Sequence, residues 1–224
     1  MNRLHRITLL LGKEAVSKLN KSTVMVVGCG AVGSFAVEAL ARSGIGHLIL
    51  IDFDKVEESN INRQLFALDS TVGRSKVEIA KQRILDINPE IKVDSYDMFF
   101  DENTDIDVKP NFVIDAIDTV PSKIALYKWC IDKNIPFISS MGAARKTDIT
   151  KIKIDKISKT TVCPLASKIR RIVRDVNMND FPVVYSVENA APQISGGREF
   201  GSVVTVTGTF GLMLADFVIK KLSM

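Results

Sequence analysis

Short apolar runs recur along the chain as far as Ser140, and stretches with helical periodicity lie between them. Four of these runs predict buried strands: Val24–Val27, His47–Ile51, Phe112–Ala116 and Ile135–Ser140. Helices are predicted after Gly33, from Lys76 to Ile87 and from Ser122 to Lys133, because apolar residues recur there at helical spacing. We expect the last helix to pack through Ile124, Leu126, Trp129 and Ile131. This alternation is typical of an α/β, mostly parallel, doubly wound sheet.

The remaining segments follow other patterns. Residues 149–155, ITKIKID, alternate apolar and charged positions. They predict a half-exposed strand and thus an antiparallel C-terminal extension of the sheet, to which Phe181–Ser186 adds a short strand. Residues 1–21 predict a helical lead-in, and the glycine-rich residues 188–201 predict a flexible loop. No clean boundary interrupts the chain, so we expect a single domain over residues 1–224.

The tail from Ser202 to Lys221 is apolar and approaches membrane-spanning length. Asp216 and the spaced threonines argue against a span. The pattern instead predicts a strand over Val203–Val206, followed by a buried helix through Phe217. Peripheral contact of this tail with a membrane remains open.

Composition narrows the class of protein. Apolar residues make up 46% of the 224 residues, which predicts a globular chain, and the formal charge of +4 permits a nucleic-acid partner without arguing for one. The three cysteines form no CxxC pair, so we expect no zinc. The N-terminus lacks an apolar signal core, and we expect a reduced, cytoplasmic protein.

The first predicted strand ends in a glycine fingerprint. The loop contains Gly28, Gly30 and Gly33, with Ala31 and Val32 between the last two. The first glycine allows a tight turn, the second leaves room for a phosphate, and the third lets the helix approach the sheet. Asp52 ends the next strand, where an acid can accept hydrogen bonds from ribose hydroxyls. The unit predicts a Rossmann-like nucleotide site.

Polar residues beyond Asp52 indicate which nucleotide is bound. An ordinary dinucleotide site has little there, but this chain has Asp54, Ser59, Asn60, Asn62, Arg63 and Gln64. Lys76 adds a second cation. Arginine and lysine in these places suggest a polyphosphate longer than a pyrophosphate bridge, because they stabilise charge on a transferring phosphate.

The strand over Phe112–Ala116 leads into two carboxylates, Asp115 and Asp118. Ligands of such sheets lie at the carboxyl ends of strands. Carboxylates there can hold Mg²⁺ against phosphates, since magnesium favours hard oxygen ligands. The alternative for Asp118 is to cap the helix that starts near Pro121, and both roles are compatible.

These motifs resemble the ATP-dependent adenylating enzymes, a family that includes ubiquitin-activating enzymes and bacterial activators of sulfur-carrier proteins. The matching segments are the Gly28–Gly33 loop, Asp52–Asp54, Ser59–Gln64, Lys76 and Asp115–Asp118. Within the family, three further segments resemble dehydratases that act on threonylcarbamoyladenosine in tRNA: Ile87–Pro89, Ser139–Ala143 and Ser158–Ala166. The resemblance covers nearly the whole chain.

The resemblance implies a mechanism and partners. ATP adenylates a carboxylate on the modified adenosine, and an internal nitrogen then displaces AMP, so that one water is lost. Asp118 would lie on the magnesium side, beside Arg63 and Lys76, and Arg6 would reach the triphosphate of the other subunit in a homodimer. The alternative within the family is adenylation of the C-terminal glycine of a ubiquitin-like sulfur-carrier protein; a sulfur-transfer partner stays open.

Other residues carry weaker chemical signals. Cys163 is a candidate acyl acceptor or a buried small residue, and nothing nearby in the sequence clearly activates it. Basic residues in the second half are candidates for RNA phosphate contact: Arg145, Lys146, Lys168, Arg170, Arg171 and Arg174. Two other classes, a nicotinamide-dependent dehydrogenase and a non-catalytic nucleotide sensor, leave the cation and carboxylate set unexplained.

Overall fold

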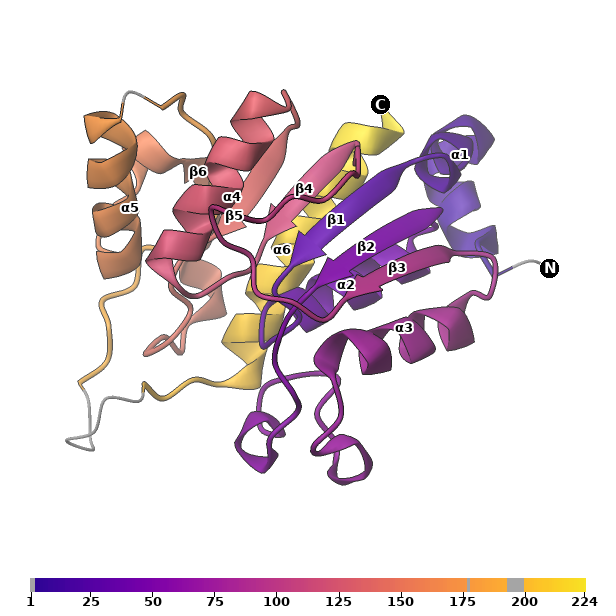
Figure 1. The fold of residues 1–224 in the computed structure, drawn as a ribbon, viewed down its shortest axis with the longest axis horizontal. Coiled ribbons are helices and arrows are strands. Elements are labelled where there is room, and N and C mark those ends of the chain that lie inside the picture. The colour runs from indigo at the N-terminus through magenta and orange to yellow at the C-terminus, as the bar shows by residue number, and fades with distance from the viewer. Residues whose placement is uncertain (1–2, 177, 193–199) are drawn as a thin grey trace.

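A seven-stranded sheet forms the centre of the computed structural model, which describes residues 3–176, 178–192 and 200–224 (Figure 1). The order is β3-β2-β1-β4-β5-β7-β6, and every neighbouring pair is parallel except β7 with β6. The strands are β1 (Thr23–Val27), β2 (His47–Ile51), β3 (Lys92–Tyr96), β4 (Phe112–Asp115), β5 (Phe137–Ser140), β6 (Ile152–Lys156) and β7 (Pro182–Ser186). The predicted fold class, including the antiparallel extension, is confirmed.

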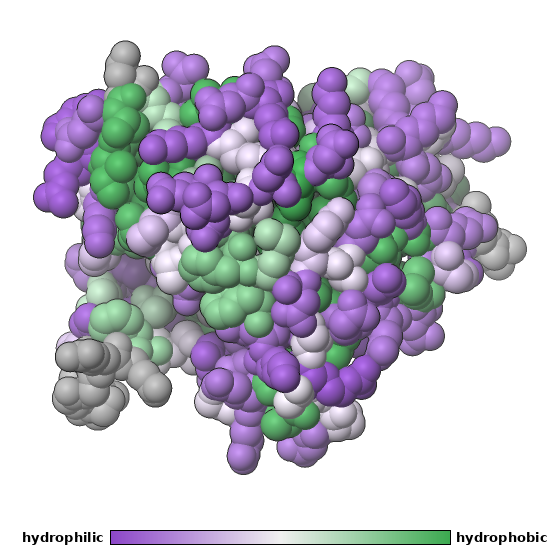
Figure 2. All heavy atoms as spheres, viewed as in Figure 1, coloured by the Kyte–Doolittle hydropathy of each residue, from purple (hydrophilic) through white to green (hydrophobic). Residues whose placement is uncertain are grey.

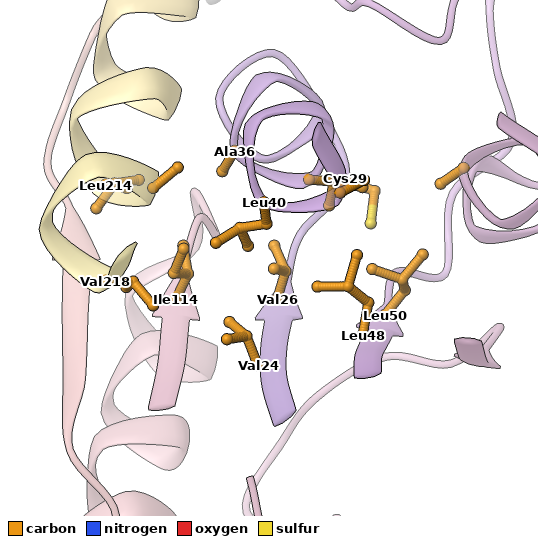
Figure 3. Packing of buried hydrophobic residues seen from close by; sticks show 14 of the residues in the cluster. Val24, Val26, Cys29, Ala36, Leu40, Leu48, Leu50, Ile114, Leu214 and Val218 are labelled. Atoms are coloured by element: carbon orange, nitrogen blue, oxygen red, sulfur yellow. The ribbon is translucent and has the colours of Figure 1, made fainter. Parts of the chain in front are cut away.

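Helices cover both faces of the sheet. They are α1 (His5–Asn20), α2 (Gly33–Arg42), α3 (Lys76–Ile87), α4 (Val120–Asp132), α5 (Pro164–Asp175) and α6 (Val204–Ser223). Side chains of β1 alternate between two apolar clusters: Val24 and Val26 pack toward α2 and α6 (Figure 3), and Met25 and Val27 pack toward α4. Burial on both faces explains why the strands read as continuous apolar runs. On the face shown in Figure 2 the surface is mostly hydrophilic, with apolar patches between the polar side chains.

The order of the strands creates a crevice at one end of the sheet. The chain runs from β1 outward to β2 and β3, and then returns to β4 on the opposite side of β1. The loops after β1 and β4 therefore diverge, and a gap opens at the carboxyl ends of these strands. The glycine loop and Asp118 follow the two strands that border this gap.

The C-terminal tail differs from its prediction. Helix α6 begins at Val204, so the strand predicted over Val203–Val206 is wrong. It crosses α2 at close range: a Cβ on Gly211 would lie 2.2 Å from the Val32 carbonyl oxygen, and one on Gly208 3.3 Å from the Phe35 ring. The tail is apolar because it belongs to the core. Among the described residues, no helix is long and apolar enough to cross a membrane.

Two further helices refine the predictions. The lead-in forms α1, in which Gly12 interrupts the helix with φ 86°. Helix α4 packs inward through Leu126, with Ile124 and Trp129 against the same apolar cluster as predicted, but Ile131 is exposed. The helix also buries Ser122, Lys123, Tyr127 and Cys130. Of the predicted loop at 188–201, residues 193–199 lie outside the described residues.

Candidate functional site

A cavity of about 510 Å³ lies in the crevice at the carboxyl ends of β1, β2, β4 and β5. Most of the residues predicted to bind a nucleotide line it: Gly28, Gly30, Ala31, Val32, Asp52, Asp54, Asn60, Arg63, Lys76 and Asp118. Gly33, Ser59 and Asn62 do not line the cavity. The structure thus gathers residues from three strand-to-helix connections that are up to 90 positions apart (Gly28 to Asp118).

The three glycines of the loop have different roles. Gly28 has φ +93°, and a Cβ there would lie 2.7 Å from the Ala116 carbonyl oxygen. A Cβ on Gly33 would come within 1.7 Å of the Gly28 carbonyl oxygen, so α2 can start here only with glycine. At Gly30, by contrast, the nearest atom to such a Cβ is Gln64 Nε2 at 3.8 Å. The space over Gly30 is open to the cavity, as the approach of a phosphate requires.

Asp52 is held as a fixed acceptor at the end of β2. Its Oδ2 accepts from the Cys29 backbone N–H at 2.6 Å, and its Oδ1 accepts from the Asp54 N–H at 2.8 Å. Burial raises the pKa of this carboxyl, although the two N–H groups and Lys76 act in the opposite direction. An oriented carboxylate in the cavity wall is suited to binding ribose hydroxyls.

The two predicted cations also line the cavity. Lys76 begins α3 and its Nζ lies 2.7 Å from Asp54 Oδ2. Arg63 Nη1 donates to the Ser59 carbonyl oxygen at 2.6 Å and to Asn62 Oδ1 at 2.9 Å. Ser59 and Asn62 therefore orient Arg63 rather than face the cavity themselves. Both cations remain positioned to meet an anion.

The two carboxylates after β4 separate into different environments. Asp118 is exposed and lines the cavity. The capping alternative is not supported, because Thr119 is the N-cap of α4 and that cap has no side-chain hydrogen bond. Asp115 is fully buried and cannot help to hold magnesium, since its oxygens are occupied by other groups.

Asp115 belongs to a buried polar network behind the cavity. Lys123 Nζ donates to Asp115 Oδ2 and to the Ser140 carbonyl oxygen, each at 2.7 Å. Tyr127 and Ser139 donate to the same carboxylate oxygen at 2.9 and 2.5 Å. Burial and the Asp115 charge raise the Tyr127 pKa well above its usual value. The network fixes α4 and β5 to β4, and it was not predicted from the sequence.

Apolar residues that sequence reasoning missed line one side of the cavity. They include Phe53 and Phe99, whose rings meet edge to face with centroids 4.9 Å apart, and Met98, Phe100 and Ile117. Ser122 also lines this cavity, and its buried hydroxyl has no hydrogen-bond partner among the described residues. An apolar wall with one free hydroxyl fits a nucleobase, and a carboxylate, open glycine loop and cations fit the ribose and phosphates.

The other side of the cavity has small residues. Its lining comes from the end of β5 and the start of α6: Ser140, Met141, Gly142, Ala143, Ala144, Ser202 and Thr207, with Leu165 and Phe200. Phe200 carries no motif that could have identified it.

Two predicted residues lie away from the cavity. Arg6 is exposed on α1 and does not line it. Cys163 is 2% exposed within an apolar cluster and does not line it either, although its Sγ lies only 3.6 Å from where a Gly142 Cβ would be. The structural role of Cys163 is therefore favoured over a nucleophile.

The basic residues divide into two groups. Arg145 and Lys146 bond the segment that follows β7, through Ala191 and Glu188 respectively. On α5, Lys168, Arg170, Arg171 and Arg174 line a second cavity of about 850 Å³. Arg170 is partly engaged there by Thr160, whose carbonyl and hydroxyl oxygens both accept from Nη1 at 2.6 Å. Arg145 and Lys146 do not line this second cavity.

Comparison with known proteins agrees with this geometry. The tRNA threonylcarbamoyladenosine dehydratase of Bacillus subtilis is 50% identical over 177 residues, which cover 78% of this chain and 70% of that protein. The Escherichia coli protein of the same name is 35% identical over 95% of this chain and 90% of its own length. Its crystal structure in complex with AMP superposes with a TM-score of 0.92 at 38% identity, covering 98% of this chain and 93% of that one.

Two other matches bear on the nucleotide and on the alternative function. The complex of the Escherichia coli dehydratase with ATP has a TM-score of 0.91 at 37% identity. A molybdopterin-synthase adenylyltransferase of Haemophilus influenzae is 37% identical, over 58% of this chain and 54% of its own length. The ThiF family model matches residues 2–224. The chain belongs to the ThiF family.

Proposed function

We propose that this protein is an ATP-dependent tRNA threonylcarbamoyladenosine dehydratase. The observation that carries the proposal is the single cavity that joins an open glycine loop, a ribose acid, two cations and an exposed carboxylate. Relatives of that name match most of the chain at 35–50% identity. We expect one domain and a cytoplasmic location, where its tRNA substrate is found.

Each group in the cavity has a part in nucleotide binding. Asp52 accepts hydrogen bonds from the ribose, and the backbone around Gly30 approaches the phosphates. Lys76 and Arg63 neutralise charge on the triphosphate, which stabilises the transition state of transfer at the α-phosphate. Asn60 is buried, and its Oδ1 accepts from the Glu57 N–H at 3.2 Å. This hydrogen bond shapes the loop that carries Arg63.

The reaction has two steps. The carboxylate of the threonyl group attacks the α-phosphorus of ATP, a P–O bond forms, and pyrophosphate leaves. An internal nitrogen of the substrate then attacks the acyl carbon and loses its proton, and AMP departs with the carboxylate oxygen. One ATP is converted to AMP and pyrophosphate while the nucleoside loses the elements of water. No enzyme nucleophile is needed, which agrees with the burial of Cys163.

Magnesium fits the site through Asp118. Within the described residues, no group of three or more His, Cys, Asp or Glu side chains could form a metal cage. A single exposed carboxylate beside a polyphosphate is nevertheless a common arrangement for this ion, since phosphates and water supply the other ligands. Magnesium bound there would neutralise phosphate charge.

A homodimer would complete the site with Arg6. This residue lies on α1, where Leu9 and Leu10 are 69% and 81% exposed. Exposed leucines on one helix are suited to burial against a second subunit. We propose that Arg6 reaches the triphosphate in the partner's cavity. Mixing Arg6→Ala with Asp118→Ala subunits should restore activity to a fraction of dimers; no recovery would contradict exchange across subunits.

The α5 cavity is the proposed contact for tRNA phosphates. Lys168, Arg171 and Arg174 are exposed and lie on one helix. Replacing Lys168 and Arg171 by Ala should weaken tRNA binding and reduce its dependence on salt, because fewer counterions are then released. ATP binding should not change.

The proposal is tested by nucleoside mass analysis. The protein is incubated with ATP, Mg²⁺ and tRNA bearing threonylcarbamoyladenosine, and the RNA is then digested under mild conditions. We expect loss of one water from that nucleoside, dependent on ATP and abolished in Asp118→Ala. An unchanged nucleoside, despite ATP binding, would overturn the proposal and favour activation of a sulfur-carrier protein.

A further inference from the structure

Arg145, which follows β5 and the cavity residue Ala144, bonds the chain at Ala191 and at Gly201. Its backbone N–H donates to the Gly201 carbonyl oxygen at 2.9 Å, and its carbonyl oxygen accepts from the Ala191 N–H at 2.8 Å. Its side-chain Nε donates to the Ala191 carbonyl oxygen at 2.6 Å. Arg145 also has φ 60°, a conformation that is uncommon for a residue with a side chain. One residue thus holds the chain both before and after the segment between Ala191 and Gly201.

Neighbouring bonds strengthen this attachment. The Glu188 carboxylate accepts from the Thr147 and Asp148 backbone N–H groups at 3.0–3.1 Å. Lys146 is 3% exposed, and its Nζ donates to the Glu188 carbonyl oxygen. The segment after β5 and the segment after β7 are therefore bonded at successive positions, which sets the place of Arg145.

Phe200 lies directly beside this junction. Its side chain is 58% exposed and it lines the cavity on the side of the small residues. The Arg145 guanidinium carbon lies 5.8 Å from the centroid of the ring. This contact is within the range of a cation–π interaction. The structure thus presents an aromatic ring at the cavity, supported by a cation and still largely open to solvent.

Two other aromatic residues, Phe53 and Phe99, are better placed than Phe200 to contact the base of ATP. Phe53 and Phe99 line the same cavity near Asp52, the proposed ribose acceptor. Phe200 lies with Ser202 and Thr207 at the start of α6 instead. Unpaired RNA bases are commonly bound by stacking on aromatic rings and arginine planes. A ring that lines the cavity and has an arginine beside it has this character.

We propose that Phe200, with Arg145 behind it, is a stacking platform for an unpaired base of the RNA substrate. The inference rests on the proposed function and deepens it. Phe200 contacts the RNA, and Arg145 is a positioning residue that acts through Phe200. The platform holds a base of the single-stranded loop at the cavity, which aligns the modified nucleoside with the α-phosphate.

Substitutions at Phe200 test the platform. Phe200→Ala should raise the KM and Kd for tRNA bearing threonylcarbamoyladenosine by about 5- to 150-fold, the range for loss of one stacked base. Phe200→Trp should restore both constants, while Phe200→Leu, which has apolar volume but no aromatic face, should not. The Kd for ATP should stay within about twofold in all three, because Asp52 and the glycine loop are untouched. Phe99→Ala is the matched control and should weaken ATP rather than RNA.

The outcomes separate the platform from the proposed function. Rescue by leucine, or a change confined to the ATP Kd, would overturn the platform while leaving the dehydratase proposal intact. If the wild-type protein binds tRNA without changing its nucleoside, and Phe200→Ala still weakens that binding, the dehydratase proposal fails and the platform stands. Absence of tRNA binding by the wild-type protein would overturn both.

Discussion

Two lysine–aspartate ion pairs flank the cavity, and they have the same length. Lys76 Nζ lies 2.7 Å from Asp54 Oδ2, and Lys123 Nζ lies 2.7 Å from Asp115 Oδ2. Their surroundings differ. Asp54 has 46% of its side chain exposed, whereas the side chains of both Lys123 and Asp115 are completely buried. Distance alone therefore does not distinguish a functional pair from a structural one.

The partners available to each lysine explain the difference. Lys76 can turn from Asp54 to a phosphate, because Asp54 remains solvated after it loses its partner. Lys123 also bonds Ser139 and the Ser140 carbonyl oxygen, so its three donors all have acceptors. Moving it would leave a carboxylate buried without a counterion. In the first pair, Lys76 can exchange Asp54 for a phosphate of the ligand. The second pair holds β4, α4 and β5 in place.

The largest effect is expected when the buried pair is broken. Lys123→Met should lower the free energy of unfolding by about 3–5 kcal/mol, because Asp115 is left as an unpaired buried charge. Urea denaturation followed by circular dichroism measures this loss. Lys128→Met, at an exposed position of the same helix, is the control and should change stability by less than about 0.5 kcal/mol.

A second substitution identifies the cause of that loss. Combining Lys123→Met with Asp115→Leu removes both charges, and it should be less destabilising than Lys123→Met alone. If the double variant is as unstable as the sum of the two single variants, the charge pairing is not the source of the effect. The comparison with Lys76 would then lose its physical basis.

Breaking the pair that the buried Lys76 forms with the half-exposed Asp54 should affect catalysis instead. Lys76→Met should reduce kcat/KM for the dehydration by about 10²–10³-fold, the usual cost of losing one group that stabilises developing charge. The free energy of unfolding should change by no more than about 1 kcal/mol, as is typical when one partner stays solvated. Steady-state kinetics and urea denaturation of the same preparation measure both quantities. Lys81→Met, which removes a positive charge from the same helix, is the matched control. An equal loss of kcat/KM in Lys81→Met would show that the loss reflects the net charge of the protein rather than the position of Lys76.

The glycine loop repeats this contrast between binding and structure. Gly30→Ala should fold normally, because its Cβ would meet nothing nearer than 3.8 Å, but should raise the Kd for ATP about tenfold by obstructing the phosphates. Isothermal titration measures the affinity. Gly33→Ala, whose Cβ would lie 1.7 Å from the Gly28 carbonyl oxygen, should instead lose stability. Equal ATP affinity in Gly30→Ala and the wild type would contradict the placement of the phosphates over Gly30.

The sequence predicted the features that depend on short-range backbone geometry. The glycine loop, Asp52 and the limits of α3 follow from local rules, and the structure agrees with each of them. The prediction of a strand at the start of the apolar tail was wrong, because β-branched residues such as Val203 and Val204 favour strands. Gly208 and Gly211 allow α6 to approach α2 closely, and this contact between helices is not visible in the sequence.

Buried polar groups were the main features that periodicity could not predict. Counting apolar residues on α4 turned Ile131 inward, but the helix buries Lys123 and Tyr127 because Asp115 satisfies them. A lysine in an amphipathic helix is expected to face solvent. The positive φ of Arg145 and its bonds to Ala191 likewise have no sequence signal.

A third ion pair is also partly exposed, and breaking it should show the smallest effect. Glu38 on α2 has a 15% exposed side chain and accepts from Arg83 on α3 at 2.6 and 3.0 Å, and from Arg42 at 2.7 Å. Burial acts to raise the Glu38 pKa, but hydrogen bonds and charge from Arg83 and Arg42 together lower it. We expect Glu38→Gln to lower the free energy of unfolding by about 1 kcal/mol at pH 7.

The pH dependence follows from the sign of that shift. Because the folded-state pKa of Glu38 is lowered, its stabilisation is fully present above the unfolded pKa of about 4.3 and is lost as the pH falls through the folded value. Urea denaturation of the wild type and Glu38→Gln should therefore differ at pH 7, and the difference should shrink as the pH falls below the unfolded pKa of about 4.3. A difference that stays constant from pH 7 to pH 3 would show that the lost packing of the side chain, rather than its charge, stabilises the contact between α2 and α3.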